Sequence, residues 1–130
     1  MARLLLVDDN SDHLDILALF LRGHYAVSKC GSAAEALQAI EHFMPDVLLL
    51  DIRMAPVDGV QCLQAIRGLP ECSSIPAIAV TALDGECFLS AGFQAVVTKP
   101  VVEPAELIAV VKSVLTRTRE PVNIVDLAAD

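Results

Sequence analysis

The stretch Val47-Leu48-Leu49-Leu50-Asp51 places four consecutive apolar residues directly before an acidic one. An apolar run this short indicates a strand buried on both faces, as in a parallel sheet covered by helices. Asp51 then lies where this strand leaves the core, and residues 52–59 follow as a loop. In open parallel sheets the ligand crevice lies just beyond such carboxyl ends. We therefore interpret Asp51 as a candidate nucleophilic carboxylate.

Composition limits the class of protein to which this strand can belong. The chain has 130 residues, 55% of them hydrophobic and 20% charged, which fits one α/β domain with a buried core and excludes disorder. No apolar run approaches the ~18 residues of a membrane span. The predicted first strand follows Met1-Ala2-Arg3 directly, so no signal peptide is expected and the location predicted is cytoplasmic.

Charge and cysteine usage exclude further classes. The formal net charge of −8 argues against nonspecific nucleic-acid binding, since phosphate backbones need Lys and Arg. The four cysteines form no C-x-x-C pair and have no neighbouring histidine at metal-ligand spacing. We interpret them as reduced thiols: Cys30, Cys62, Cys72 and Cys87.

Five strands alternate with five helices along the chain. Apart from residues 47–51, strands are predicted at 4–7, 25–28, 77–81 and 95–99. Helices are predicted at about 14–21, 32–40, 58–67, 83–91 and 104–116. This alternation predicts a doubly wound α/β fold with right-handed crossovers, while the pattern alone leaves the strand order open.

Two helix starts carry capping signals. Ser32 followed by Glu35 predicts a capping box, and Asp58 occupies the N-cap position of the third helix. Asp8, Asp9 and Asn10 precede the first helix, and a role as its N-cap is the ordinary alternative for each of them.

Four of the five predicted strands end on groups capable of chemistry. These groups are Asp8 with Asp9, then Asp51, Thr81 and Lys99. Each has an ordinary explanation when taken alone, as a cap, a loop acid, a buried strand hydroxyl or a solvated lysine. A parallel sheet nevertheless gathers such ends at one edge, so the joint pattern predicts a single polar crevice.

The predicted crevice suits phosphoryl transfer. Three gathered carboxylates repel one another, at about 4 kcal/mol per pair for ~4 Å and an effective dielectric near 20. Protonation of one acid or a bound cation would relieve this, and oxygen-only ligands favour Mg²⁺. Lys99 and the Thr81 hydroxyl suit a phosphoryl group in line between a donor and Asp51.

The chain resembles the receiver domains of two-component response regulators over residues 2–116. The resemblance rests on four motifs: Val7-Asp8-Asp9-Asn10, Leu48-Leu49-Leu50-Asp51 with Asp58-Gly59, Val80-Thr81-Ala82, and Thr98-Lys99-Pro100. It implies the flavodoxin-like, chemotaxis-regulator-like fold: a five-stranded parallel sheet in the order 2-1-3-4-5 flanked by five helices. Residues 1–116 are then one receiver domain, and residues 117–130 form a tail that we leave unassigned.

The resemblance also implies residue roles. Asp51 would accept a phosphoryl group from the phosphohistidine of a histidine kinase or phosphotransfer domain, giving an aspartyl phosphate. Mg²⁺ would be held by Asp8, Asp9, Asp51 and the backbone carbonyl of Arg53. Thr81 and Lys99 would bind phosphoryl oxygens. The Lys99–Pro100 bond is expected to be cis, as is usual in the family. The domain would catalyse its own phosphorylation and dephosphorylation as a switch, not as a turnover enzyme.

Three departures from the family pattern concern signal output. Ala55 stands where the family usually has proline, and Pro56 follows one residue later. Val96 aligns with the usual switch aromatic, so rotation of an aromatic ring behind Thr81 cannot occur. The segment between Thr81 and Lys99 is also about one helical turn shorter than usual. We expect the phosphoryl chemistry to be retained and the output to use another route.

Other functions remain as alternatives. A binding-only pseudo-receiver with constitutive partner contact is the main one. An aspartyl-phosphate hydrolase would need a second acid at the position of Arg53, and a flavodoxin-like cofactor binder would need a phosphate loop after the first strand. The expected partners are therefore proteins: a kinase or phosphotransfer domain, an output protein of unspecified identity, and a second copy if an outer helix face forms a dimer. No helix-turn-helix fits after the last helix, so direct DNA binding is not expected.

Overall fold

The computed structural model describes residues 1–82, 91–101 and 103–119. A five-stranded parallel sheet in the order β2-β1-β3-β4-β5 forms its centre. The strands are β1 (Arg3–Val7), β2 (Ala26–Cys30), β3 (Val47–Asp51), β4 (Ala77–Thr81) and β5 (Ala95–Thr98). The predicted fold and strand order are confirmed.

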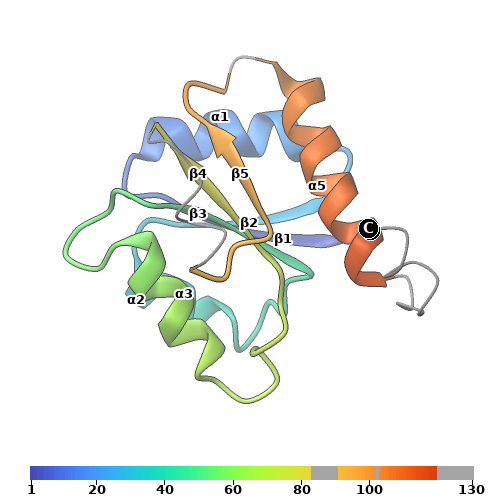
Figure 1. Ribbon diagram of the computed structural model, residues 1–130. Helices are drawn as coiled ribbons and strands as arrows, with labels where there is room; N and C mark the ends of the chain where they lie inside the picture. Colours follow the sequence, from blue (N-terminus) through green and yellow to red (C-terminus); the bar gives the residue numbers. More distant parts are fainter. Residues whose placement is uncertain (83–90, 102, 120–130) are drawn as a thin grey trace.

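Helices cover both faces of the sheet. The helices among the described residues are α1 (Ser11–Leu21), α2 (Ala33–Ala39), α3 (Gly59–Arg67) and α5 (Pro104–Arg119). Figure 1 shows α1 and α5 on one face and α2 and α3 on the other. The helix predicted at 83–91 and the tail from residue 120 lie outside the described residues, except for Ala91. Within the described part, no helix is both long and apolar enough to cross a bilayer.

The central strand explains why the sheet is covered on both sides. All five residues of β3 are buried, and so are all five of β4. Alternate residues enter different cores: Leu48 and Leu50 belong to the core under α2 and α3, whereas Val47 and Leu49 belong to the core under α1 and α5. This alternation is what a two-residue side-chain period requires of a strand between two helix layers.

All three helix starts have an N-cap at a candidate residue, and only the capping box of α2 differs in detail. The Asn10 side chain accepts from the N–H groups of Asp12 and His13, so Asn10 and neither neighbouring acid caps α1. Asp58 caps α3 in a complete capping box with Gln61.

The capping box predicted for α2 is only half correct. Ser32 accepts from the N–H of Glu35 as expected, at 3.1 Å. The Glu35 carboxylate, however, accepts from the N–H of Gly31 at 2.6 Å, one residue before the N–H that a capping box uses. The acid still satisfies a backbone donor in the turn that leads into the helix.

Strand ends and loops differ slightly from prediction. The edge strand β2 runs over Ala26–Cys30, later than the predicted 25–28, and β5 ends at Thr98 so that Lys99 begins the following loop. The Lys99–Pro100 bond is cis as expected, and Ala55–Pro56 is cis as well. Cys30 and Cys62 are free and buried, and burial raises the pKa of each thiol to about 11.

Candidate functional site

Three carboxylates meet at the carboxyl edge of the sheet. Asp8 and Asp9 follow β1, and Asp51 ends β3, the next strand in the sheet. One ligand oxygen from each lies within 4.8 Å of the other two. Asp8 and Asp51 are buried, at 1% and 6% exposure, whereas Asp9 is exposed. The predicted acidic cluster is therefore present and opens to solvent through Asp9.

The loops position these acids through short backbone contacts. Asp8 accepts from the N–H of Asn10 at 2.9 Å, and its own N–H donates to the carbonyl of Cys30 at 3.1 Å. Behind Asp51, the N–H of Gly59 donates to the carbonyl of Ile52 at 2.9 Å. A Cβ on Gly59 would approach the Asp51 carbonyl oxygen to 2.3 Å, so only glycine allows α3 to begin this close to the acid.

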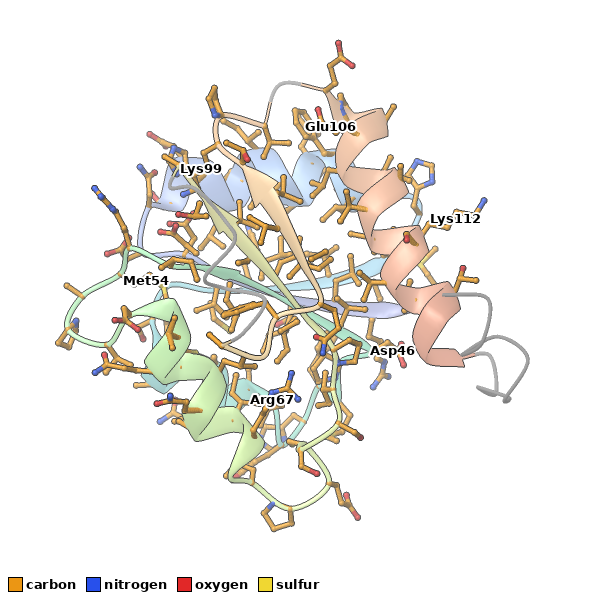
Figure 2. The ribbon with its side chains drawn as sticks, viewed as in Figure 1. Asp46, Met54, Arg67, Lys99, Glu106 and Lys112 are labelled. Carbon is orange, nitrogen blue, oxygen red and sulfur yellow. The ribbon has the colours of Figure 1, made fainter. Side chains whose placement is uncertain are left out.

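Lys99 lies between the two buried acids. Its Nζ is 3.0 Å from Asp8 Oδ2 and 3.2 Å from Asp51 Oδ1, and only 16% of its side chain is exposed. The Lys99 N–H donates to the carbonyl of Thr81 at 2.8 Å, which ties the two strand ends together. Figure 2 shows Lys99 at the end of β5, among the side chains gathered at this edge. The ammonium thus relieves part of the repulsion between the carboxylates. It does so in addition to the two means that the sequence suggested, protonation of one acid and a bound cation.

Burial and Asp8 shift the pKa of Asp51 in one direction, and Lys99 shifts it in the other. Burial, and secondly the charge of Asp8, raise the pKa of the Asp51 carboxyl above its usual value, and Lys99 lowers it by less. The protonated form is consequently favoured relative to an exposed aspartate. An added cation would stabilise the ionised form, which is the form that can act as a nucleophile.

A cavity of about 230 Å³ contains all the residues predicted for the site. Asp8, Asp9, Asn10, His13, Asp51, Arg53, Thr81, Ala82 and Lys99 line it. Thr81, 1% exposed, closes the β4 side, and the exposed Arg53 lies on the loop after β3. The carboxylates offer only hard oxygen ligands, and Lys99 uses some of the same oxygens. The donor set therefore fits Mg²⁺, provided that Lys99 moves off the oxygens that the ion takes.

His13 is the site residue that the strand-end argument missed. It belongs to the first turn of α1, and its Nδ1 lies 2.9 Å from Lys99 Nζ and 3.6 Å from Asp8 Oδ2. It lies four positions after Asp9, which precedes the N-cap of α1, and this proximity in sequence was the available signal. That spacing does not reveal contact with a lysine 86 positions away.

The fold and this edge define a class: a doubly wound α/β domain with an acidic, lysine-containing pocket at the carboxyl ends of its strands. The family model for the response regulator receiver domain matches residues 4–112. The chain belongs to the response regulator receiver domain family.

The chain is also similar to individual relatives and to solved structures. A 14.6 kDa protein of Leptolyngbya boryana is 38% identical over 84% of this chain and 86% of its own length. Response regulator Rre1 of Synechocystis is 34% identical over 88% of this chain but only 52% of its own length, so the chain spans about half of that relative. A crystal structure of a candidate response regulator from Chloroflexus aurantiacus superposes with a TM-score of 0.80 at 34% identity, covering 89% of this chain and 98% of that one.

Proposed function

We propose that this receiver domain accepts a phosphoryl group on Asp51 in a Mg²⁺-dependent reaction. The proposal rests mainly on one observation: a buried carboxylate lies 3.2 Å from a lysine ammonium and within 4.8 Å of two further acids. That arrangement supplies a nucleophile, a mobile positive charge and a hard-cation ligand set in one small cavity. The donor is the phosphohistidine of a histidine kinase or phosphotransfer domain.

In the transfer, an Asp51 carboxylate oxygen attacks phosphorus. The new O–P bond forms as the P–N bond to the donor imidazole breaks, and the leaving nitrogen keeps the electron pair. Lys99 turns its ammonium from the Asp51 carboxylate to a phosphoryl oxygen, and the Thr81 hydroxyl donates to another. Asp8, Asp9, Asp51 and the Arg53 carbonyl would hold Mg²⁺, which when bound would supply positive charge for the phosphoryl oxygens. Attack by water on the aspartyl phosphate later restores Asp51 and releases phosphate.

The phosphorylated domain acts as a switch that signals through protein contact in the cytoplasm, not as a turnover enzyme. Val96 lies half-buried on β5 against the core under α2 and α3, so the signal does not travel through an aromatic ring at this position. Moving a two-state equilibrium most of the way needs about 5 kcal/mol of differential stabilisation. This stabilisation has to come from contacts of the phosphoryl group with Thr81 and Lys99, or from formation of a homodimer.

Intact-protein mass after incubation with a small acyl phosphate and Mg²⁺ tests the proposal. Wild type should gain one phosphate-sized, hydroxylamine-labile adduct, and chelation of Mg²⁺ should abolish the gain. Asp51→Asn should gain nothing, because an amide is not a nucleophile. Asp12→Asn is the matched control: it removes an exposed carboxylate of α1 near the pocket and should behave as wild type.

Two outcomes would contradict the proposal. A gain of equal size in Asp51→Asn would assign the phosphoryl group to another residue. No gain in wild type, from acyl phosphate or from a phosphorylated histidine domain, together with no Mg²⁺ binding, would favour a binding-only pseudo-receiver.

A further inference from the structure

The contact between His13 and Lys99 joins two parts of the site that come from opposite ends of the chain. Asn10 caps α1 with hydrogen bonds of 3.0 and 3.2 Å to the N–H groups of Asp12 and His13, which fixes the first helical turn. His13 Nδ1 then lies 2.9 Å from Lys99 Nζ. The histidine side chain is 43% exposed, whereas the lysine side chain is 16% exposed.

The donor inventory determines the state of this histidine. A lysine ammonium has three N–H donors and no acceptor. Three atoms surround Lys99 Nζ at hydrogen-bonding distance: Asp8 Oδ2 at 3.0 Å, Asp51 Oδ1 at 3.2 Å and His13 Nδ1 at 2.9 Å. When the ammonium donates to all three atoms, Nδ1 is the acceptor of the third N–H, which is the role it has in the Nε2–H tautomer.

His13 differs from the other two acceptors because it stays available during the reaction. When the phosphoryl group is attached, one Asp51 oxygen enters the new O–P bond and the carboxylate charge is lost. Asp8 is needed as a cation ligand. His13 Nδ1 takes part in neither step. It can therefore hold one N–H of Lys99 while the other two exchange carboxylate oxygens for phosphoryl oxygens.

Two cavities meet at His13 and Lys99. His13, Ala82 and Lys99 line both the acidic cavity and a second, apolar cavity of about 390 Å³. Leu17 and Val80 line only the apolar one. The His13–Lys99 pair therefore lies at the boundary between the two spaces. An apolar residue at position 13 would leave the third N–H without an acceptor on this side.

We propose that His13 is a positioning residue, whose Nδ1 holds the Lys99 ammonium over the phosphoryl-acceptor position of Asp51. The inference rests on the proposed function and assigns the orientation of its lysine to a residue of α1. It predicts that the acceptor atom at position 13 matters, and not the imidazole ring as such.

Three variants test this prediction by the rate of phosphoryl acceptance from acyl phosphate at saturating Mg²⁺. His13→Leu removes the acceptor, and the rate should fall about tenfold, the factor expected for one lost hydrogen bond. His13→Asn places Oδ1 near the position of Nδ1, and the rate should stay within about threefold of wild type. His42→Leu, an exposed histidine away from the site, should leave the rate unchanged. His13→Phe replaces the leucine variant if thermal unfolding shows that the latter is misfolded.

A second readout does not depend on phosphoryl transfer. Nitrogen-15 NMR of the metal-free protein should show the Nε2–H tautomer of His13, with an Nδ1 resonance that moves when Lys99 is replaced by methionine. The His24 and His42 resonances should not move.

The outcomes separate the two proposals. Equal rates for wild type and a folded His13→Leu would overturn the positioning role and leave the proposed function intact, as would an unshifted Nδ1 resonance in Lys99→Met. If wild type itself does not accept a phosphoryl group, the proposed function is overturned. The positioning role is then overturned with it, even if NMR detects the hydrogen bond between His13 and Lys99.

Discussion

At the scale of single residues, the site combines groups that are unfavourable in a folded protein. Asp51 is buried beside Asp8, and only Lys99 offsets their negative charge among the described neighbours. Charge without full compensation costs stability, and active sites commonly carry this cost because the charge is used in the reaction. Because the pKa of Asp51 is raised in the folded state, this cost makes the stability of the protein depend on pH.

Asp51→Asn should therefore stabilise the metal-free protein at neutral pH. The folded-state pKa of Asp51 lies above the unfolded value, so the folded state loses stability relative to the unfolded one as pH rises through the folded pKa. The variant has no such loss. The difference should be smallest below about pH 4, where Asp51 is protonated in both the folded and the unfolded state, and it should grow as pH rises through the folded pKa.

Urea unfolding of both proteins from pH 4 to pH 8, with chelator present, measures this difference. A difference in the free energy of unfolding that is constant with pH would contradict the raised pKa of Asp51. A variant less stable than wild type at pH 7 would also contradict it.

Single residues also mark the limit of reasoning from sequence. Asp8, Asp9 and Asn10 were equivalent candidates for the cap of α1, and the structure assigns the cap to Asn10. Sequence could not decide because all three side chains accept hydrogen bonds equally well at an N-cap. His13 escaped prediction because its partner is 86 positions away, and local spacing carries no information about that contact.

At the scale of elements, the start of α3 lies very close to the end of β3. Gly59 packs against the backbone of Asp51 and Ile52. A Cβ on Gly59 would lie 2.3 Å from the carbonyl oxygen of Asp51 and 2.9 Å from the Cα of Ile52. Both contacts are with backbone, which cannot move aside by rotating a side chain. The acid and the helix are therefore positioned together.

Gly59→Ala should destabilise the protein by about 1–3 kcal/mol, because the added methyl group forces α3 away from β3. Gly68→Ala is the matched control at the other end of the same helix. Its Cβ would meet nothing nearer than 3.5 Å and its φ is −79°, so the change should be within about 0.5 kcal/mol.

Chemical denaturation of the two variants measures both values. Equal effects at positions 59 and 68 would mean that the approach of α3 to β3 is not as tight as described.

The elements with the strongest burial were also the easiest to predict. β4 has the bounds read from its apolar run, and so has β3, because such a run must be covered on both faces. The edge strand β2 begins later than predicted, since its half-buried residues give no clear apolar boundary. Glu35 reaches Gly31 because the loop geometry before α2, which the sequence does not specify, presents that N–H to the carboxylate.

At the scale of the whole molecule, the fold brings residues from positions 8 to 99 into one cavity. The alternating pattern predicts a parallel sheet and therefore one edge for all strand ends, but it leaves strand order open. The order β2-β1-β3-β4-β5 was available only from family resemblance. It makes β1 and β3 neighbours, and this is why Asp8 and Asp51 meet.

Because the acidic cluster exists only in the folded chain, cation binding should be linked to global stability. Mg²⁺ at 100 times its dissociation constant should raise the free energy of unfolding by about 2.7 kcal/mol. The Asp9→Asn variant, which lacks one ligand, should lose most of this gain, whereas Asp12→Asn should retain it. Thermal unfolding with MgCl₂, against NaCl of equal ionic strength, measures the effect. An equal shift in all three proteins would indicate nonspecific screening.

The most direct test of the central claim is to locate the phosphoryl group itself. Borohydride reduces an aspartyl phosphate to homoserine, which peptide mass spectrometry places at a single residue. After phosphorylation with acyl phosphate and Mg²⁺, homoserine should occur at position 51 and be absent without Mg²⁺. Homoserine at position 8 or 9, or at none of the three, would contradict the account.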